Sequence, residues 1–404
     1  MYSKQEILQF VEEEDVKFIR LAFCDVYGTP KNISIMDTEL NRAFEQGIAI
    51  DAWSIAGFAN HLHSDIILHP DPSTLSILPW RPEHGKVVRM FCDITWPDGT
   101  IFACDTRKIL QQAVEKAKNA NLSFQFGSEI EFYLFNRDEY GNPTSVPYDQ
   151  AGYMDIAPDD KGENVRREIC FTLEQMDIRP ESSHHEEGPG QNEIDFRYSA
   201  PLNSADDAVT FLTVVKTVAN QSGLFASFEP KPMENEAGNG MHINFSLLGH
   251  QNDAVFKHCI AGILKFIPDM TVFLNRTENS YKRLGTDKAP CYITWSEQNR
   301  SQLIRIPAAT GRYRRAELRS PDPCANPYLA YALMIHAGLY GIEHKLELPP
   351  ATDLNLYCAP KEVTDKFDSL PCNLEEAQKI ARNSEFIQSI LPNHIIDTYC
   401  GEAL

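Results

Sequence analysis

The chain has 404 residues, of which 43% are hydrophobic and 23% charged, and its formal net charge is −20. This length suffices for two or three domains with a sizeable core, and the negative charge argues against a nucleic-acid-binding protein. The N-terminus is charged from Lys4, and the longest apolar run, residues 330–342, is too short to span a bilayer. Ten cysteines without paired spacing indicate a reducing compartment. We therefore expect a cytoplasmic protein without membrane contact.

The first hundred residues are rich in strand signals. Residues 17–34 alternate around the turn DVYGTP and predict a β-hairpin, and further strand-like segments extend to about residue 103. Asp105 and Thr106 then cap a predicted helix over 106–120. We expect a boundary here, which gives a small N-terminal domain over 1–104 and a larger domain over 105–404.

Strands and helices intermix in the second domain. Strands are expected at 123–135, near 185, and at 193–198, 241–248, 302–306 and 315–319; helices are expected at 162–176, 204–221, 254–275 and 326–345, with more from about 373. Because these elements do not follow a regular βαβ alternation, an α+β fold with a largely antiparallel sheet is predicted.

Four of these strands carry a polar face opposite an apolar one. In FGSEIEFYLF, Glu129 and Glu131 lie two residues apart and so point to the same side of a strand. The other polar faces consist of His242, Asn244 and Ser246; of Gln191, Glu193, Asp195 and Arg197; and of Arg315, Glu317 and Arg319. A solvated sheet face explains any single strand, but Glu, His and Arg recur here where Lys, Thr and Ser would be usual. Converging faces would offer carboxylates and an imidazole, which suit Mg²⁺ or Mn²⁺.

Arginines cluster close to these strands. Six lie between residues 300 and 319, namely Arg300, Arg305, Arg312, Arg314, Arg315 and Arg319. Guanidinium groups match phosphate oxygens, and carboxylate-held metals beside arginines are typical of phosphoryl transfer. Neither a P-loop nor a GxGxxG turn occurs. The residues alone thus indicate a metal-dependent enzyme that acts on a phosphorylated substrate such as ATP.

Eight segments, in this order, resemble the glutamine synthetase family, and within it the shorter bacterial type I. They are DAWSIAGF, FGSEIEFYLF, ENVRREI, SSHHEEGPGQNEIDFRY, KPMENEAGNGMHINFSL, NSYKRL, NRSQLIRIP and RAELRSPDPCANPYLAYAL. The resemblance implies an N-terminal β-grasp domain and a catalytic domain with a mostly antiparallel curved sheet flanked by helices. It also implies ring oligomers in which neighbouring subunits share each active site.

The resemblance further implies a role for each matched residue. Two or three Mg²⁺ or Mn²⁺ ions per site would be bound by Glu131, Glu186 and Glu193 and by Glu129, His242 and Glu317. ATP, the co-substrate, would contact Arg300, Arg305, Arg315, Glu181, Asn244 and Ser246. Glutamate would contact Arg283, Arg319 and Gly238, and ammonium would contact Asp51, Ser54 and Tyr153. Asp51, Arg300, Arg315 and Arg319 would take part in catalysis. Glu187, Asp195, His184 and His185 are not expected to be ligands.

Several positions depart from the family pattern. The family flap NSYKRLVPGYEAP is NSYKRLGTDKAP here, so Lys288 stands where the family has a glutamate that accepts a proton from ammonium. Asp287 is the nearest acid that could replace that glutamate. Ala237 replaces an asparagine that contacts the amino acid, and Trp53 adds a large ring near the amine site.

Three functions remain open at this point. The favoured one is an ATP-dependent ligase that forms glutamine from glutamate and ammonia through an acyl phosphate. The second is a γ-glutamylamide ligase that uses an organic amine. The third is a non-catalytic regulatory relative, which retention of all six metal ligands argues against. The sequence does not decide between one ring and two.

Overall fold

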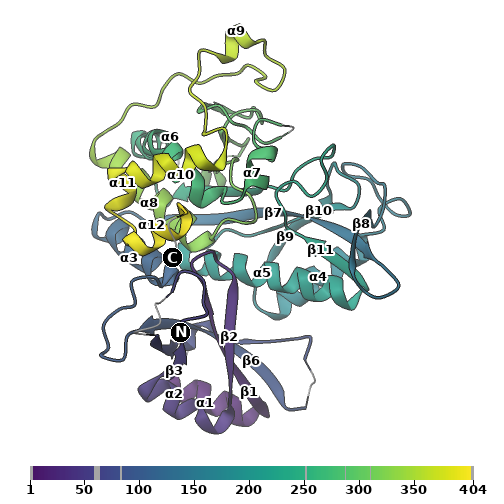
Figure 1. Cartoon of the computed structure of the whole chain (residues 1–404), viewed down its shortest axis with the longest axis vertical. Coiled ribbons are helices and arrows are strands. Elements are labelled where there is room, and N and C mark those ends of the chain that lie inside the picture. Colours follow the sequence, from purple (N-terminus) through teal and green to yellow (C-terminus); the bar gives the residue numbers. More distant parts are fainter. Residues whose placement is uncertain are drawn as a thin grey trace.

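The structure is a computed structural model that describes residues 3–58, 64–81, 84–250, 253–286, 288–309 and 311–401, and only the backbone of Arg312. Two β-sheets organise the chain: a six-stranded sheet near the N-terminus and a nine-stranded sheet in the remainder (Figure 1). This arrangement matches the predicted α+β class with a small sheet domain first.

The N-terminal sheet has the strand order β2-β1-β6-β4-β3, and β5 also pairs with β6. Its strands are β1 (Val16–Cys24), β2 (Pro30–Met36), β3 (Ile48–Asp51), β4 (Asp65–Pro70), β5 (Ser76–Ile77) and β6 (Lys86–Thr95). The predicted hairpin is confirmed, since β1 and β2 pair antiparallel around residues 25–29. Helices α1 (Lys4–Glu13) and α2 (Leu40–Gln46) pack on this sheet and were not predicted.

The larger sheet runs in the order β13-β14-β15-β12-β7-β10-β9, and β8 and β11 also pair with β7. Its strands are β7 (Phe124–Arg137), β8 (Pro143–Pro147), β9 (Pro180–His185), β10 (Gln191–Phe196), β11 (Leu224–Ser227), β12 (Met241–Leu247), β13 (Trp295–Glu297), β14 (Ile304–Ile306) and β15 (Ala316–Leu318). Every pairing is antiparallel except β13 with β14. The expected, largely antiparallel sheet is therefore observed.

Helices pack against this sheet and against one another. They are α3 (Thr106–Asn119), α4 (Glu163–Gln175), α5 (Pro201–Gln221), α6 (Ala254–Leu274), α7 (Glu278–Arg283), α8 (Pro327–Glu343), α9 (Lys361–Thr364), α10 (Leu374–Asn383), α11 (Glu385–Gln388) and α12 (Asn393–Tyr399). Helices α6 and α8 approach closely, because a Cβ at Gly262 would lie 2.1 Å from the carbonyl oxygen of Ala337. The predicted helices are found with shifts of a few residues; α5 begins earlier than expected because Pro201 occupies its first turn.

Buried polar contacts join the two parts of the chain. Arg107, at the start of α3, binds Asp71 and Asp93 of the N-terminal part and Asp206 of α5 at 3.0–3.1 Å. The carbonyl oxygen of Val26 accepts hydrogen bonds from residues near both ends of the C-terminal helical region. None of the described helices has the length and apolar character needed to cross a membrane.

Candidate active site

Four adjacent strands, β15, β12, β7 and β10, bring the predicted polar faces together. His242 pairs in register with Glu129, Glu193 with Glu131, and Asn244 with Glu317. Most of these side chains are buried, so the face is not the solvated one that a single strand would permit. Burying carboxylates in this way requires compensating positive charge.

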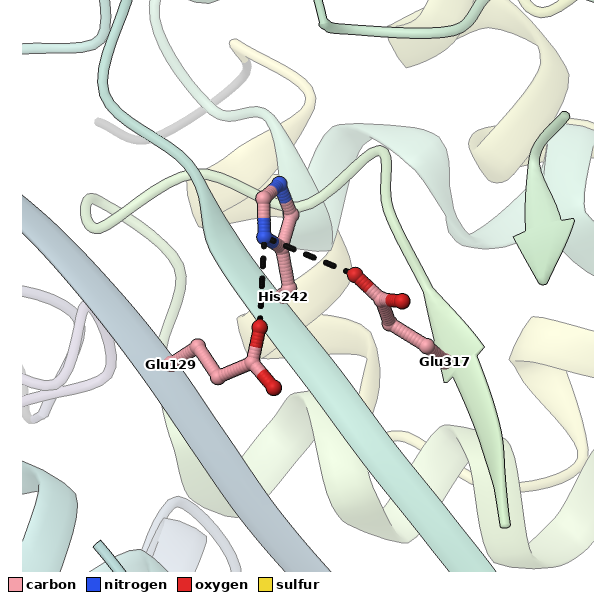
Figure 2. A group of neighbouring side chains, drawn as sticks. All are labelled: Glu129, His242 and Glu317. Carbon is pink, nitrogen blue, oxygen red and sulfur yellow. Dashed lines mark ion pairs between the residues drawn. The ribbon is translucent and has the colours of Figure 1, made fainter. Parts of the chain in front are cut away.

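The first cluster consists of Glu129, His242 and Glu317, one residue from each of three strands (Figure 2). Nδ1 of His242 lies 3.7 Å from Oε2 of Glu129 and 3.6 Å from Oε1 of Glu317. Both carboxylates thus face the same ring nitrogen, as Figure 2 shows. Two carboxylate oxygens and one imidazole nitrogen are suitable ligands for Mg²⁺ or Mn²⁺.

The second predicted set, Glu131, Glu186 and Glu193, is spread over two overlapping groups. Glu193 lies close to Glu131 and His242 in one group, and close to Glu186 and His184 in the other. Nε2 of His184 is 3.2 Å from Oε1 of Glu186 and 3.7 Å from Glu193. His184, which was not expected to be a ligand, therefore lies where its ring nitrogen could bind a metal ion together with Glu186 and Glu193.

The charge balance at this face fits the binding of cations. Burial and the neighbouring Asp195 and Glu131 carboxylates raise the pKa of Glu193 well above its usual value. Burial, followed by the charge of Glu129, raises the pKa of Asp195 to about 6. Oδ1 of Asp195 is buried and has no hydrogen-bond partner among the described residues. Metal ions would relieve this excess of negative charge.

The pKa of Glu317 is lowered, in contrast to the raised pKa values of Glu193 and Asp195. It accepts hydrogen bonds from Arg305 at 2.7 Å and from Arg319. Burial alone would raise the pKa of Glu317, but the charges of Arg319, His242 and Arg305 lower it to about 2. Nε of Arg315 donates to Asn244 at 2.7 Å. These arginines therefore lie directly beside the first cluster.

The other predicted arginines occupy different environments. Arg283 is 2% exposed and donates to the carbonyl oxygens of Ser320 at 2.8 Å and Arg319 at 3.3 Å. Gly238 lies against it, because a Cβ there would come 2.8 Å from Cγ of Arg283. Arg300 is exposed, and its carbonyl oxygen accepts a hydrogen bond from Nε of Arg319.

A cavity of about 200 Å³ opens beside Glu129. Its lining residues are Gly127, Ser128, Glu129, Glu181, Ser182, Asp195, Phe196, Tyr198, Asn244 and Arg315. Three of the residues predicted to contact nucleotide, Glu181, Asn244 and Arg315, therefore line one cavity. Ser246, Arg300 and Arg305 do not line it, although Ser246 lies on the same strand as Asn244.

The residues predicted to bind ammonium are divided between the two sheets. Asp51, at the end of β3, and the nearby Ser54 are exposed. Strand β3 lies in the N-terminal part, away from β7 and β10 (Figure 1). Tyr153 lies at the large sheet, where its ring is 5.5 Å from that of His184. A single chain therefore does not bring the three residues together.

The flap ends near Glu186. Nζ of Lys288 lies 3.3 Å from Oε2 of Glu186 and 2.9 Å from Oε1 of Glu187, so both carboxylates are ion-paired with this lysine. Asp287 lies outside the described residues. The carbonyl oxygen of Ala237 accepts a hydrogen bond from the Tyr133 hydroxyl at 2.6 Å.

Sequence reasoning missed a buried network behind Glu186. Nε2 of His185 contacts Oδ1 of Asp149 at 2.8 Å, and its Nδ1 contacts the carbonyl oxygen of Glu186 at 2.6 Å. Asp149 also accepts hydrogen bonds from the backbone amides of Gly190 and Lys161. The network fixes the loop that carries Glu186, and no spacing rule links Asp149 to His185 over 36 residues.

Comparison with known proteins agrees with this geometry. The model of the glutamine synthetase β-grasp domain matches residues 15–97, and that of the glutamine synthetase catalytic domain matches residues 103–402. Glutamine synthetase of Clostridium saccharobutylicum is 43% identical over 98% of this chain and 93% of its own length. The Methanosarcina mazei enzyme is 44% identical, over 98% and 92%.

Solved structures have the same fold. A structure titled "GmaS/ADP complex-Conformation 1" is 27% identical, with a TM-score of 0.87 over 97% of this chain and 93% of that one. A Plasmodium falciparum glutamine synthetase structure gives a TM-score of 0.87 over 99% and 95% at 22% identity, which supports the fold alone. The matched domains and the full-length relatives together show that the chain belongs to the glutamine synthetase family.

Proposed function

We propose that the chain is an ATP-dependent ligase that joins ammonia to the γ-carboxylate of glutamate. The observation that carries this proposal is the cluster of Glu129, His242 and Glu317, with Arg305, Arg315 and Arg319 beside it. Relatives named glutamine synthetase, 41–44% identical over 98% of the chain, support the same reaction.

The two acidic groups would hold Mg²⁺ or Mn²⁺. One ion would be bound by Glu129, His242 and Glu317, and another by Glu131, Glu186 and Glu193. Bound divalent ions neutralise the phosphate oxygens and the charge that develops during phosphoryl transfer. The raised pKa values of Glu193 and Asp195 support this assignment, because they indicate carboxylates that lack a counter-charge.

The chain's own residues would orient ATP and glutamate. Glu181, Asn244 and Ser246 would contact the nucleotide from the cavity beside Glu129 and from β12. Arg300, Arg305 and Arg315 would contact the phosphates, while Arg283, Arg319 and Gly238 would hold glutamate. The γ-carboxylate oxygen attacks the terminal phosphorus of ATP and ADP leaves; ammonia then attacks the acyl carbon of the acyl phosphate and phosphate leaves.

A complete ammonium-binding site would require a second copy of the chain. Asp51 and Ser54 lie in the N-terminal part, whereas Tyr153 lies beside the large sheet. A ring in which one subunit presents Asp51 to its neighbour would complete the site, and Asp51 would then bind ammonium and assist its deprotonation. We also propose a division into domains 1–104 and 105–404, and a cytoplasmic location.

Product analysis tests the proposal. Purified protein is incubated with ATP, Mg²⁺, glutamate and either ammonium or one of a panel of small organic amines. The ADP formed is quantified, and the mass of the product is determined by mass spectrometry. We expect ADP formation that depends on ammonium and yields glutamine. Product with organic amines alone would indicate a γ-glutamylamide ligase. No ADP under any condition would reject an enzymatic function of this class.

A further inference from the structure

The ammonium group of Lys288 lies among two carboxylates and an aromatic ring. Its Nζ lies 2.9 Å from Oε1 of Glu187, 3.3 Å from Oε2 of Glu186 and 4.4 Å from the centre of the Tyr153 ring. Two carboxylates and the face of an aromatic ring are the groups with which proteins bind small cations. The side-chain ammonium of Lys288 therefore lies among groups that would also bind a free ammonium ion.

The shortened flap holds Lys288 in this position. The amide of Gly285 donates to the carbonyl oxygen of Ala289 at 2.8 Å, and the amide of Ala289 donates back to Thr286 at 3.0 Å. Lys288 has a φ of +59°, a left-handed conformation that is uncommon for this residue type. Its carbonyl oxygen accepts a hydrogen bond from Arg319 at 3.2 Å. The turn is therefore anchored to the buried arginine beside Glu317.

The two oxygens of Glu186 face different partners. Oε1 lies 3.2 Å from His184, on the side of the acidic groups that could bind metal. Oε2 accepts the amide of Glu187 at 2.9 Å and faces Lys288. A metal ion on Oε1 and a cation on Oε2 would therefore approach Glu186 from separate directions. The Lys288 position is consequently compatible with a loaded metal site.

We propose that Lys288 is a built-in competitor for ammonium at Glu186, Glu187 and Tyr153, where the family resemblance already implies that the amine substrate contacts Tyr153. The inference rests on the proposed function and identifies Lys288 as a residue that sets the apparent affinity for the amine substrate. Because the lysine is tethered, its ammonium group acts at an effective concentration on the order of millimolar or more. Free ammonium must displace it, and the lysine side chain, which is already 32% exposed, would move further into solvent.

Kinetics of flap variants test this inference. Lys288→Met removes the charge but keeps the length, Lys288→Arg keeps the charge, and Lys288→Asn removes the charge with a residue that tolerates left-handed backbone. Lys282→Met is the control, because Lys282 is an exposed lysine at the end of neighbouring α7. Initial rates are measured against ammonium and, separately, against ATP, with folding checked by thermal unfolding.

We expect Lys288→Met and Lys288→Asn to lower the KM for ammonium at least fivefold and to leave the KM for ATP within twofold. Lys288→Arg and Lys282→Met should behave like the original protein. An unchanged or raised KM for ammonium in folded, active Lys288→Met and Lys288→Asn would overturn the competitor role and leave the proposed function standing. An original protein that forms no glutamine at any ammonium concentration would overturn both.

Discussion

Replacement of Glu317 by glutamine should destabilise the protein strongly even without metal. Glu317 is 1% exposed and accepts hydrogen bonds from Arg305 and Arg319. Against the effect of burial, its cationic neighbours lower its pKa from 4.5 to about 2. That difference corresponds to roughly 3 kcal/mol in favour of the carboxylate. Because the folded-state pKa is the lower one, this contribution is complete above about pH 4.5 and is lost as the pH falls toward 2.

The amide of Glu317→Gln keeps the shape of the side chain but removes the charge that compensates buried Arg319. We therefore expect the free energy of unfolding at pH 7 to fall by about 3 kcal/mol, close to the range for breaking a buried ion pair. Urea unfolding is measured with a chelator at fixed protein concentration, since assembly also contributes to stability.

Glu297→Gln is the matched control. Glu297 pairs with Arg314 at 2.8 Å but is 58% exposed, so its loss should cost less than about 1 kcal/mol. The reasoning from burial and charge would be refuted if Glu317→Gln lowered the free energy of unfolding by less than about 1 kcal/mol. It would also be refuted if Glu297→Gln lowered that free energy as much as Glu317→Gln does.

Three further predictions concern the same site. Gly238→Ala should raise the KM for glutamate at least tenfold and leave the KM for ATP within twofold. The added Cβ would lie 2.6 Å from the carbonyl oxygen of Pro230 and 2.8 Å from Cγ of Arg283. Initial rates at varied glutamate and varied ATP give the two KM values. Asp149→Asn should lower the free energy of urea unfolding by about 1–3 kcal/mol, because it removes the charged partner of buried His185. Mg²⁺ at one hundred times its dissociation constant should stabilise the chelator-treated protein by about 2.7 kcal/mol, as followed by thermal unfolding; no stabilisation would contradict metal binding.

The sequence predicted the faces of the strands well. Spacing by two places Glu129 and Glu131 on one side of a strand whatever its neighbours are. Spacing does not predict which strands lie side by side, because strand order depends on packing across the whole domain. The in-register pairing of His242 with Glu129 is therefore a feature of the structure that spacing alone could not predict.

Other features had no local signal. Sequence reasoning identified Lys288 as a departure from the family's flap glutamate, but its contact with Glu186 depends on a left-handed backbone in a shortened turn. Helices α1 and α2 were not predicted, because they have only 10 and 7 residues and lie next to strong strand signals. The contact between Asp149 and His185 joins a loop to the end of β9, and alternation or helical periodicity carries no information on such pairs.

The most direct test of the acyl phosphate route follows the γ-carboxylate oxygens of glutamate into the released phosphate. Glutamate labelled with ¹⁸O in its γ-carboxylate is incubated with ATP, Mg²⁺ and ammonium, and the phosphate released is analysed by mass spectrometry. If the γ-carboxylate attacks ATP and ammonia displaces phosphate from the acyl carbon, each phosphate should carry one labelled oxygen for each glutamine formed. Unlabelled phosphate accompanying glutamine would contradict the acyl phosphate route.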